Sequence, residues 1–235
     1  MHPEQEVHGP EPESAVRRLS ELAEQSARCA PASCGAVATI ADGGTERRAT
    51  ATHPDLAALA SLQLAVGDGP IPTAIDRGEP VDAQDLLHEE RWPEYRALAL
   101  DSGVRASVTL PFCRTGIEVT VSLYSFRPGS LERAAYGPVG VLGEQVTAGL
   151  VRDRRYRQAL AEVDQLETAL RSRTVIDQAC GIVMHVLCCD SGEAFAVLRQ
   201  ISQRSNRKLA EVAEAVVDGK GSGLESTLAR LTQQP

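Results

Sequence analysis

Hydrophobic positions recur with two different periods along this chain. A spacing of three and four residues predicts helices over 14–29, 54–65 and 93–102, and a shorter helix over 72–77. Ser14 is the expected N-cap of the first helix, and Gly103 follows the end of the third. The segment 85–92 has no such period and is expected to be a loop.

Strand-like runs lie between these helices. GAVATIAD starts at Gly35, and ERRATAT returns after the turn signal Asp42-Gly43-Gly44. RASVTLPF and EVTVSLYS each alternate apolar with polar residues, and the connection CRTG between them predicts a hairpin. The first part of the chain is therefore predicted to be a small sheet with helices.

From residue 131 onwards the period is helical throughout. Because no Pro occurs between Pro138 and the C-terminal residue, one long helix over 131–187 is expected. Its middle is highly charged, which is typical of a helix exposed between two domains. A coiled-coil dimer seam of about two heptads is predicted along it, through Tyr156, Val163, Leu166 and Leu170.

The end of this helix and two further helices have the pattern of a small three-helix bundle. The inward stripes are expected at Val175, Ala179, Ile182, Val183 and Val186, then Ala194, Val197, Leu198 and Ile201, then Leu209, Val212, Ala213, Val216 and Val217. Asp190 and Glu193 form a capping pattern for the second helix. Asn206 is the expected N-cap of the third helix, and Gly219 its end.

Composition places limits on function. With a net charge of −8, the chain has no general field to attract nucleic acid, so any such contact needs a local basic cluster. The first 13 residues are polar and Pro-rich, are expected to be disordered, and do not form a signal peptide. No apolar run is long enough for a membrane span, so a cytoplasmic protein without membrane partners is expected.

Candidate chemistry is sparse. The six cysteines lack C-x-x-C spacing and are interpreted as reduced, small apolar residues, with a redox role for Cys188 and Cys189 as the weaker alternative. Neither a G-x-S-x-G nor an H-E-x-x-H motif is present, so neither catalysis nor a metal is expected.

Residues 14–150 resemble a GAF domain. The resemblance rests on three stretches: GDGPIPTAIDRGEPVDAQDLLHEERWPEY from Gly67, then GVRASVTLPF and LYSFRPGSLE. The resemblance implies an α/β sheet that senses a small ligand or dimerises. Where many relatives carry Cys this chain has Ile71, so thiol chemistry is not expected there. His88 and Trp92 are candidates for lining a pocket, but a surface loop and a core aromatic are the favoured interpretation. No cofactor is predicted, and the ligand is not identified.

Residues 171–219 closely resemble an ANTAR domain. The matching elements are Arg173, IDQA from Ile176, GIVM from Gly181, EAF from Glu193 with Leu198-Arg199, NRKL from Asn206, and Val212-Ala213. The resemblance implies a three-helix fold that binds RNA.

Two sets of residues are the predicted RNA contacts. One is the face opposite the core stripe of the first bundle helix, with Arg173, Asp177, Cys180 and Met184; the other is a basic set, Arg199, Arg204, Arg207 and Lys208. Cys180 departs from the family, which usually has Lys or Arg there. Since residues 171–219 hold about as many acids as bases, binding must depend on charge segregation.

The sequence thus predicts an α+β protein: a GAF-like sheet domain (14–150), a connecting helix (151–170), an ANTAR bundle (171–222) and a tail (223–235). It resembles GAF and ANTAR antitermination regulators of the actinobacterial type, which implies a non-enzymatic homodimer that binds paired stem-loops in nascent RNA. The alternative is a ligand-sensing or protein-interaction module whose bundle only dimerises. DNA binding is disfavoured, because the third helix has few side chains able to read base edges.

Overall fold

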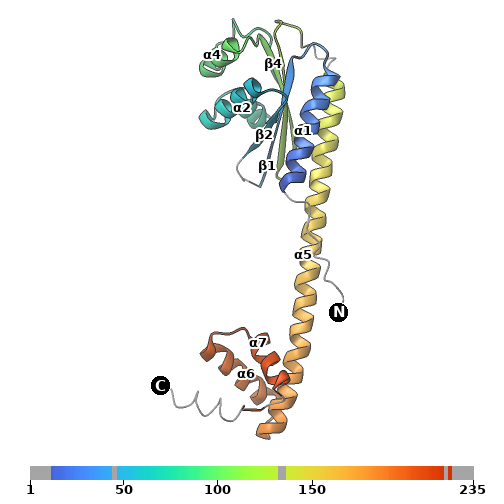
Figure 1. The fold of residues 1–235 in the computed structure, drawn as a ribbon, viewed down its shortest axis with the longest axis vertical. Helices are drawn as coiled ribbons and strands as arrows, with labels where there is room; N and C mark the ends of the chain where they lie inside the picture. Colours follow the sequence, from blue (N-terminus) through green and yellow to red (C-terminus); the bar gives the residue numbers. More distant parts are fainter. Residues whose placement is uncertain (1–11, 44–46, 132–135, 220–221, 224–235) are drawn as a thin grey trace. The chain divides into compact units, whose positions relative to one another are not determined.

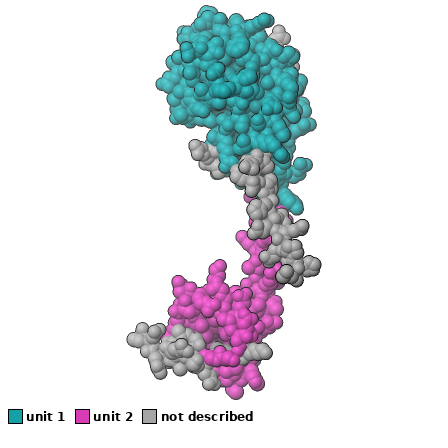
Figure 2. Space-filling view, viewed as in Figure 1, with its two compact units in different colours: residues 1–157 teal, residues 158–235 magenta. Residues whose placement is uncertain are grey.

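The computed structural model describes residues 12–43, 47–131, 136–219 and 222–223. The chain divides into two compact units, Met1–Arg157 and Gln158–Pro235 (Figure 2). Helix α5 (Tyr136–Leu187) contributes residues to both units. No single helix in the described ranges is both long and apolar enough to cross a bilayer; α5 and α6 (Ser191–Ser205), bent by 106° at their junction, meet that test only as a pair.

The first unit contains a five-stranded antiparallel sheet of order β2-β1-β5-β4-β3. Its strands are β1 (Gly35–Asp42), β2 (Arg48–Ala51), β3 (Val81–Ala83), β4 (Ala106–Arg114) and β5 (Ile117–Ser125). The hairpin of β4 and β5 turns at Thr115 and Gly116, which both have positive φ. Sequence analysis missed only β3 among the described strands, because three residues are too few to show a period.

Helices α1 (Pro12–Cys29) and α5 cover one face of this sheet (Figure 1). The alternating apolar residues of the hairpin share one face, as predicted, and it is the face that α1 and α5 cover; Val108, Val121 and Leu123 are fully buried there. Helix α1 begins two residues before the predicted N-cap, so Ser14 lies inside the helix. Residues 1–11 of the segment expected to be disordered, and residues 224–235 of the expected tail, lie outside the described residues.

The opposite face carries α2 (Pro54–Val66), α3 (Pro70–Arg77) and α4 (Pro93–Asp101). Gln63 holds α2 and α3 together, because its buried amide donates to the carbonyl of Leu59 and accepts from the N–H of Ile71. Trp92 is buried, and its indole N–H donates to Thr73 Oγ1 at 3.1 Å. With α1 and α5 on the other side, this arrangement is the GAF-like architecture that the sequence predicts.

The N-terminal part of α5 is fixed to the sheet by close packing and by ion pairs. Arg154 reaches Asp42 at 2.7 Å, and Asp153 pairs with Arg18 of α1 at 2.5 Å. Gly143 lies directly against the ring of Phe112, and an added Cβ would come within 2.2 Å of two ring carbons. The absence of a side chain at this position therefore sets how closely α5 approaches β4.

The second unit is a three-helix bundle formed by the end of α5, α6 (Ser191–Ser205) and α7 (Leu209–Asp218). Its buried core is Ala179, Val183, Ala194, Leu198, Ile201, Val212 and Ala213, all of them from the predicted inward stripes. Asp190 and Glu193 form the predicted capping box at the start of α6. Helix α7 ends at Gly219, as expected.

We predict that Gly143→Ala destabilises the first unit by about 1–3 kcal/mol, because the new methyl group overpacks against Phe112. The matched control is Gly140→Ala, where nothing lies within 4 Å of the added Cβ; it should be neutral or stabilising by up to ~1 kcal/mol. Fluorescence of Trp92, the only tryptophan, during urea unfolding reports on this unit. Equal stability of the two variants would contradict the packing argument.

Candidate nucleic-acid interface

The α5 face predicted to contact RNA is mostly open to solvent. Arg173 and Asp177 are exposed, and Met184 is 37% exposed. Cys180 differs from this expectation, because it is half-buried and packs against the core of the bundle. Burial raises the pKa of the Cys180 thiol, and the nearby Asp177 and Cys189 raise it further. The Cys180 thiol is therefore neutral at physiological pH. It does not supply the positive charge that a Lys or Arg at this position would supply.

The turn between α6 and α7 is built differently from the prediction. Asn206 is not the N-cap of α7 but the C-cap of α6, in the left-handed conformation with φ 49° and ψ 38°. Lys208 occupies the N-cap position of α7 without a side-chain cap. Asn suits both kinds of position, so its presence alone does not decide between them. Ser202 Oγ donates to the carbonyl of Arg207 at 2.7 Å and fixes the turn.

This turn brings much of the predicted basic set together. Arg204 lies in the last turn of α6, and Arg207 and Lys208 follow within four residues; all three are exposed, as is Arg199 further back along α6. The Arg207 guanidinium is engaged by Glu211, with an ion pair at 3.7 Å and a hydrogen bond to its carbonyl at 3.3 Å. The other three members of this basic set, Arg199, Arg204 and Lys208, have no ion pair within the described ranges and are available to phosphate.

A groove that sequence analysis missed lies in the same bundle. It has a volume of 580 Å³ and is lined mainly by apolar atoms of α5 and α7, from Gln178, Gly181, Ile182, His185, Val186 and Val217. Gly181 has open space where a side chain would be, which is the one signal in the sequence for such a hollow.

In the first unit, a row of hydroxyl groups lies on the sheet face under α2, α3 and α4. Thr39 and Thr120 are hydrogen-bonded at 2.7 Å, and Thr109 and Ser122 at 2.8 Å, with all four buried. The phenol of Tyr95 is hydrogen-bonded to the Ser107 hydroxyl at 2.8 Å. These groups satisfy one another. Their alternation with apolar residues in β4 and β5 is the sequence signal for this row.

Two buried tyrosines complete this face. Burial raises the pKa of Tyr124 to about 12 and that of Tyr95 well above its ordinary value. Both therefore stay neutral, and neither is poised for acid–base chemistry.

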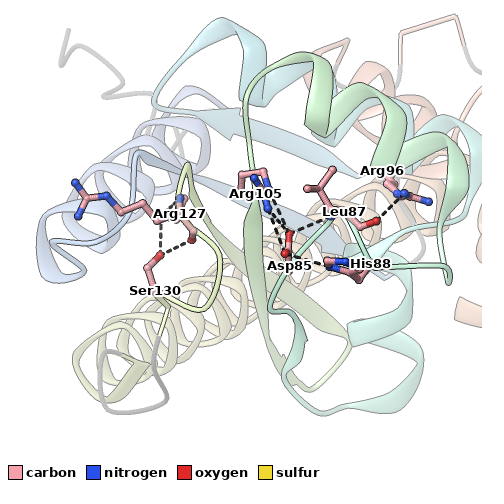
Figure 3. Close-up of polar contacts among 8 residues, drawn as sticks. Asp85, Leu87, His88, Arg96, Arg105, Arg127 and Ser130 are labelled. Carbon is pink, nitrogen blue, oxygen red and sulfur yellow. Dashed lines mark hydrogen bonds and ion pairs between the residues drawn. The ribbon is translucent and has the colours of Figure 1, made fainter.

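A cluster of polar side chains centred on Asp85 lies in the segment that follows β3, next to the start of β4 (Figure 3). The Asp85 carboxylate accepts from the N–H of Leu87 at 3.1 Å, from Arg105 at 3.0 Å and lies 3.2 Å from His88 Nδ1. The hydrogen bond from Leu87 is the main cause that lowers the pKa of Asp85, with Arg105 adding to it. His88 is otherwise exposed, so the surface-loop interpretation of His88 and the core interpretation of Trp92 are confirmed.

The cysteines agree with the sequence interpretation in being free thiols, but only three of them are partly buried. Cys29, Cys113 and Cys188 are exposed, so these three do not act as small apolar core residues. Cys34, Cys180 and Cys189 are half-buried. In the described part of the chain, no group of three His, Cys, Asp or Glu side chains is placed to hold a metal ion.

Comparison with known proteins identifies the class of the second unit. Residues 164–217 match the ANTAR domain. The comparison with curated proteins gave no match. The chain thus combines a five-stranded, GAF-like sheet unit with a segment that matches the ANTAR domain.

Several solved structures are similar to part of this chain. A GAF domain/HD domain protein from Geobacter sulfurreducens has 12% identity over 60% of this chain and 94% of its own, with a TM-score of 0.44. A domain of a two-component sensor histidine kinase protein from Sinorhizobium meliloti has 14% identity over 63% and 95%, with a TM-score of 0.44. An RNA-binding light-oxygen-voltage receptor has 20% identity over 83% and 53%, with a TM-score of 0.28. The sequence identities and TM-scores are all low, so the fold of the sheet unit is defined by its own strand order.

We predict that Asn206→Ala destabilises the second unit by about 1 kcal/mol, because Ala is strained in the left-handed region. Asn206→Gly should stay within about 0.5 kcal/mol of the unchanged protein, since Gly adopts this conformation freely. Urea unfolding followed by far-UV circular dichroism measures both. If both variants are destabilised equally, the role of Asn206 lies in its side chain instead.

Proposed function

We propose that this protein is an RNA-binding regulator of transcription antitermination, whose ANTAR domain is controlled by the GAF-like unit. The sensor extends over 14–150, the connecting helix over 151–170 and the output domain over 171–222. The observation that carries the proposal is the match of residues 164–217 to the ANTAR domain, a family of RNA-binding output modules.

The exposed basic set at the turn between α6 and α7 supports RNA as the ligand. Arg199, Arg204 and Lys208 are free of ion pairs within the described part of the chain, so binding phosphate breaks no existing ion pair. Phosphate contacts supply most of the affinity in such complexes, and unpaired loop bases supply specificity. Paired stem-loops in a nascent transcript offer both.

Dimerisation fits a paired target. The predicted seam of α5 is exposed in the single chain, with Val163 49%, Leu166 64% and Leu170 66% accessible. Such a row of apolar side chains at spacings of three and four is typical of a helix that pairs with a second copy. Two linked output domains then bind two linked stem-loops with a gain in effective concentration.

The alternative is a sensing or interaction module whose bundle dimerises without binding RNA strongly. The neutral, half-buried Cys180 favours it, because relatives usually have a cation there. A gel-shift with an RNA of two tandem stem-loops separates the two functions: a specific shift supports the regulator, and its absence at low salt supports the alternative.

We predict that Arg204→Ala and Lys208→Ala each reduce the salt dependence of RNA binding. The slope of log K against log salt should fall by about 1 for each phosphate that the variant no longer neutralises. Fluorescence anisotropy with the same tandem stem-loop RNA at several KCl concentrations measures this. Arg77→Ala, which removes an exposed charge from α3, is the control and should leave the slope unchanged. Affinity that responds neither to salt nor to the two variants would mean that this basic set is not the interface.

We predict that Leu170→Glu weakens the dimer at least about tenfold, because charges of the same sign would be buried together at the seam. Thr168→Glu adds the same charge on the opposite side of α5, where the side chain is also exposed, and should have little effect. Sedimentation equilibrium over a range of protein concentrations compares the two. Equal dissociation constants would place the dimer contact elsewhere.

A further inference from the structure

The exposed face of α5 continues without interruption beyond the predicted seam. Within the second unit, positions separated alternately by four and three residues are Ala159, Val163, Leu166, Leu170, Arg173, Asp177, Cys180 and Met184. This is a heptad repeat with Val163, Leu170, Asp177 and Met184 at one core position and Leu166, Arg173 and Cys180 at the other. The last four residues are the α5 set predicted from the ANTAR resemblance to contact RNA.

The bundle leaves this face open. The α5 residues buried against α6 and α7 are Ala179 and Val183, with zero exposure. At about 100° per residue, they lie roughly a third of a turn from the heptad face. Arg173, Asp177 and Met184 are consequently accessible, and only Cys180 is partly covered by the bundle core. A second helix therefore has access to the whole repeat up to Met184.

The charges on this face complement a second copy. Neither Arg173 nor Asp177 forms an ion pair within its own chain among the described residues. In a parallel two-stranded coil, adjacent core layers bring Arg173 of each copy next to Asp177 of the other, and the twofold axis produces the pair twice. Such a polar layer costs stability relative to apolar residues but fixes the register of the two helices.

The same four side chains suit RNA poorly. A carboxylate at Asp177 repels phosphate, the thioether of Met184 is a weak acceptor, and the Cys180 thiol is uncharged. Only Arg173 among them attracts a phosphate group. Cys180 and Met184 are, in contrast, adaptable apolar residues for a helix–helix contact.

We infer that the face formed by Arg173, Asp177, Cys180 and Met184 is the C-terminal half of the dimer seam, occupied by a second copy of this chain. The inference rests on the dimer in the proposed function and deepens it. It assigns RNA contact to the basic set at the turn between α6 and α7, and it assigns register selection to Arg173 and Asp177.

A charge exchange in the full-length chain tests this. Arg173→Asp and Asp177→Arg should each weaken the dimer about tenfold, because the layer then contains charges of one sign. The double variant, which restores the opposite charges in exchanged places, should recover most of the affinity. Sedimentation equilibrium gives the dissociation constants. Single variants without effect, or a double variant that remains as weak as the singles, would overturn the inference.

RNA binding of the same variants distinguishes the two roles of Arg173. If the face is a seam, the double variant regains binding to tandem stem-loop RNA together with the dimer. If the double variant dimerises but does not bind RNA, Arg173 contacts RNA itself. The assignment of RNA contact to the basic set alone is then overturned. Should the unchanged protein bind no such RNA, the proposed function fails, while the dissociation constants still decide the seam.

Cross-linking gives a second readout that does not depend on charge. In a chain whose other five cysteines are replaced by Ser, oxidation at pH 9 should join Cys180 to Cys180 of a second copy, since like positions of a parallel seam approach within disulfide reach. A matched chain that keeps only Cys188, which is exposed just after α5, should cross-link much more slowly. Equal rates in the two chains, with unchanged circular dichroism, would overturn the inference.

Discussion

The hydrophobic packing of α5 is the constraint on which both units depend. In the sheet unit, Val139 and Leu150 of this helix are part of the core that covers β4 and β5. In the bundle, Ala179 and Val183 supply the buried face on which α6 and α7 pack. Small side chains lie at both places: Gly143 has no room for a Cβ beside the Phe112 ring, and Ala179 is fully buried in the bundle core. One helix therefore satisfies separate packing requirements along its length.

Much of this fold was predictable because the chain has strong local periods. The alternation in β4 and β5 fixes which residues face α1 and α5, and the spacing in the bundle identifies its core. The errors occurred where one residue type suits two environments. Asn206 fits an N-cap as well as a left-handed C-cap, and the exposed Cys29 has the same composition signal as a buried thiol.

The candidate interface was harder to predict for a related reason. Spacings of four, three and four residues define an exposed helix face, and they define a heptad seam equally well. The resemblance to ANTAR domains favours RNA for Asp177 and Met184, whereas their side-chain chemistry and their continuity with Leu170 favour a second helix. Burial in the single chain does not separate these functions, because both leave the face exposed until a partner binds.

The acidic character of the chain makes the two roles interdependent. With a net charge of −8, a single copy repels RNA at long range. In the described part of the chain, the basic set at the turn between α6 and α7 offers three cations without an ion pair, Arg199, Arg204 and Lys208. Three phosphate contacts give weak binding at physiological salt. In the proposed dimer this number would double and the sites would be linked, so that binding of a first stem-loop would raise the effective concentration of the second. Under this proposal, affinity for a paired target would depend on the strength of the helix seam, and a signal that alters the seam would alter RNA binding without changing any contact to the RNA.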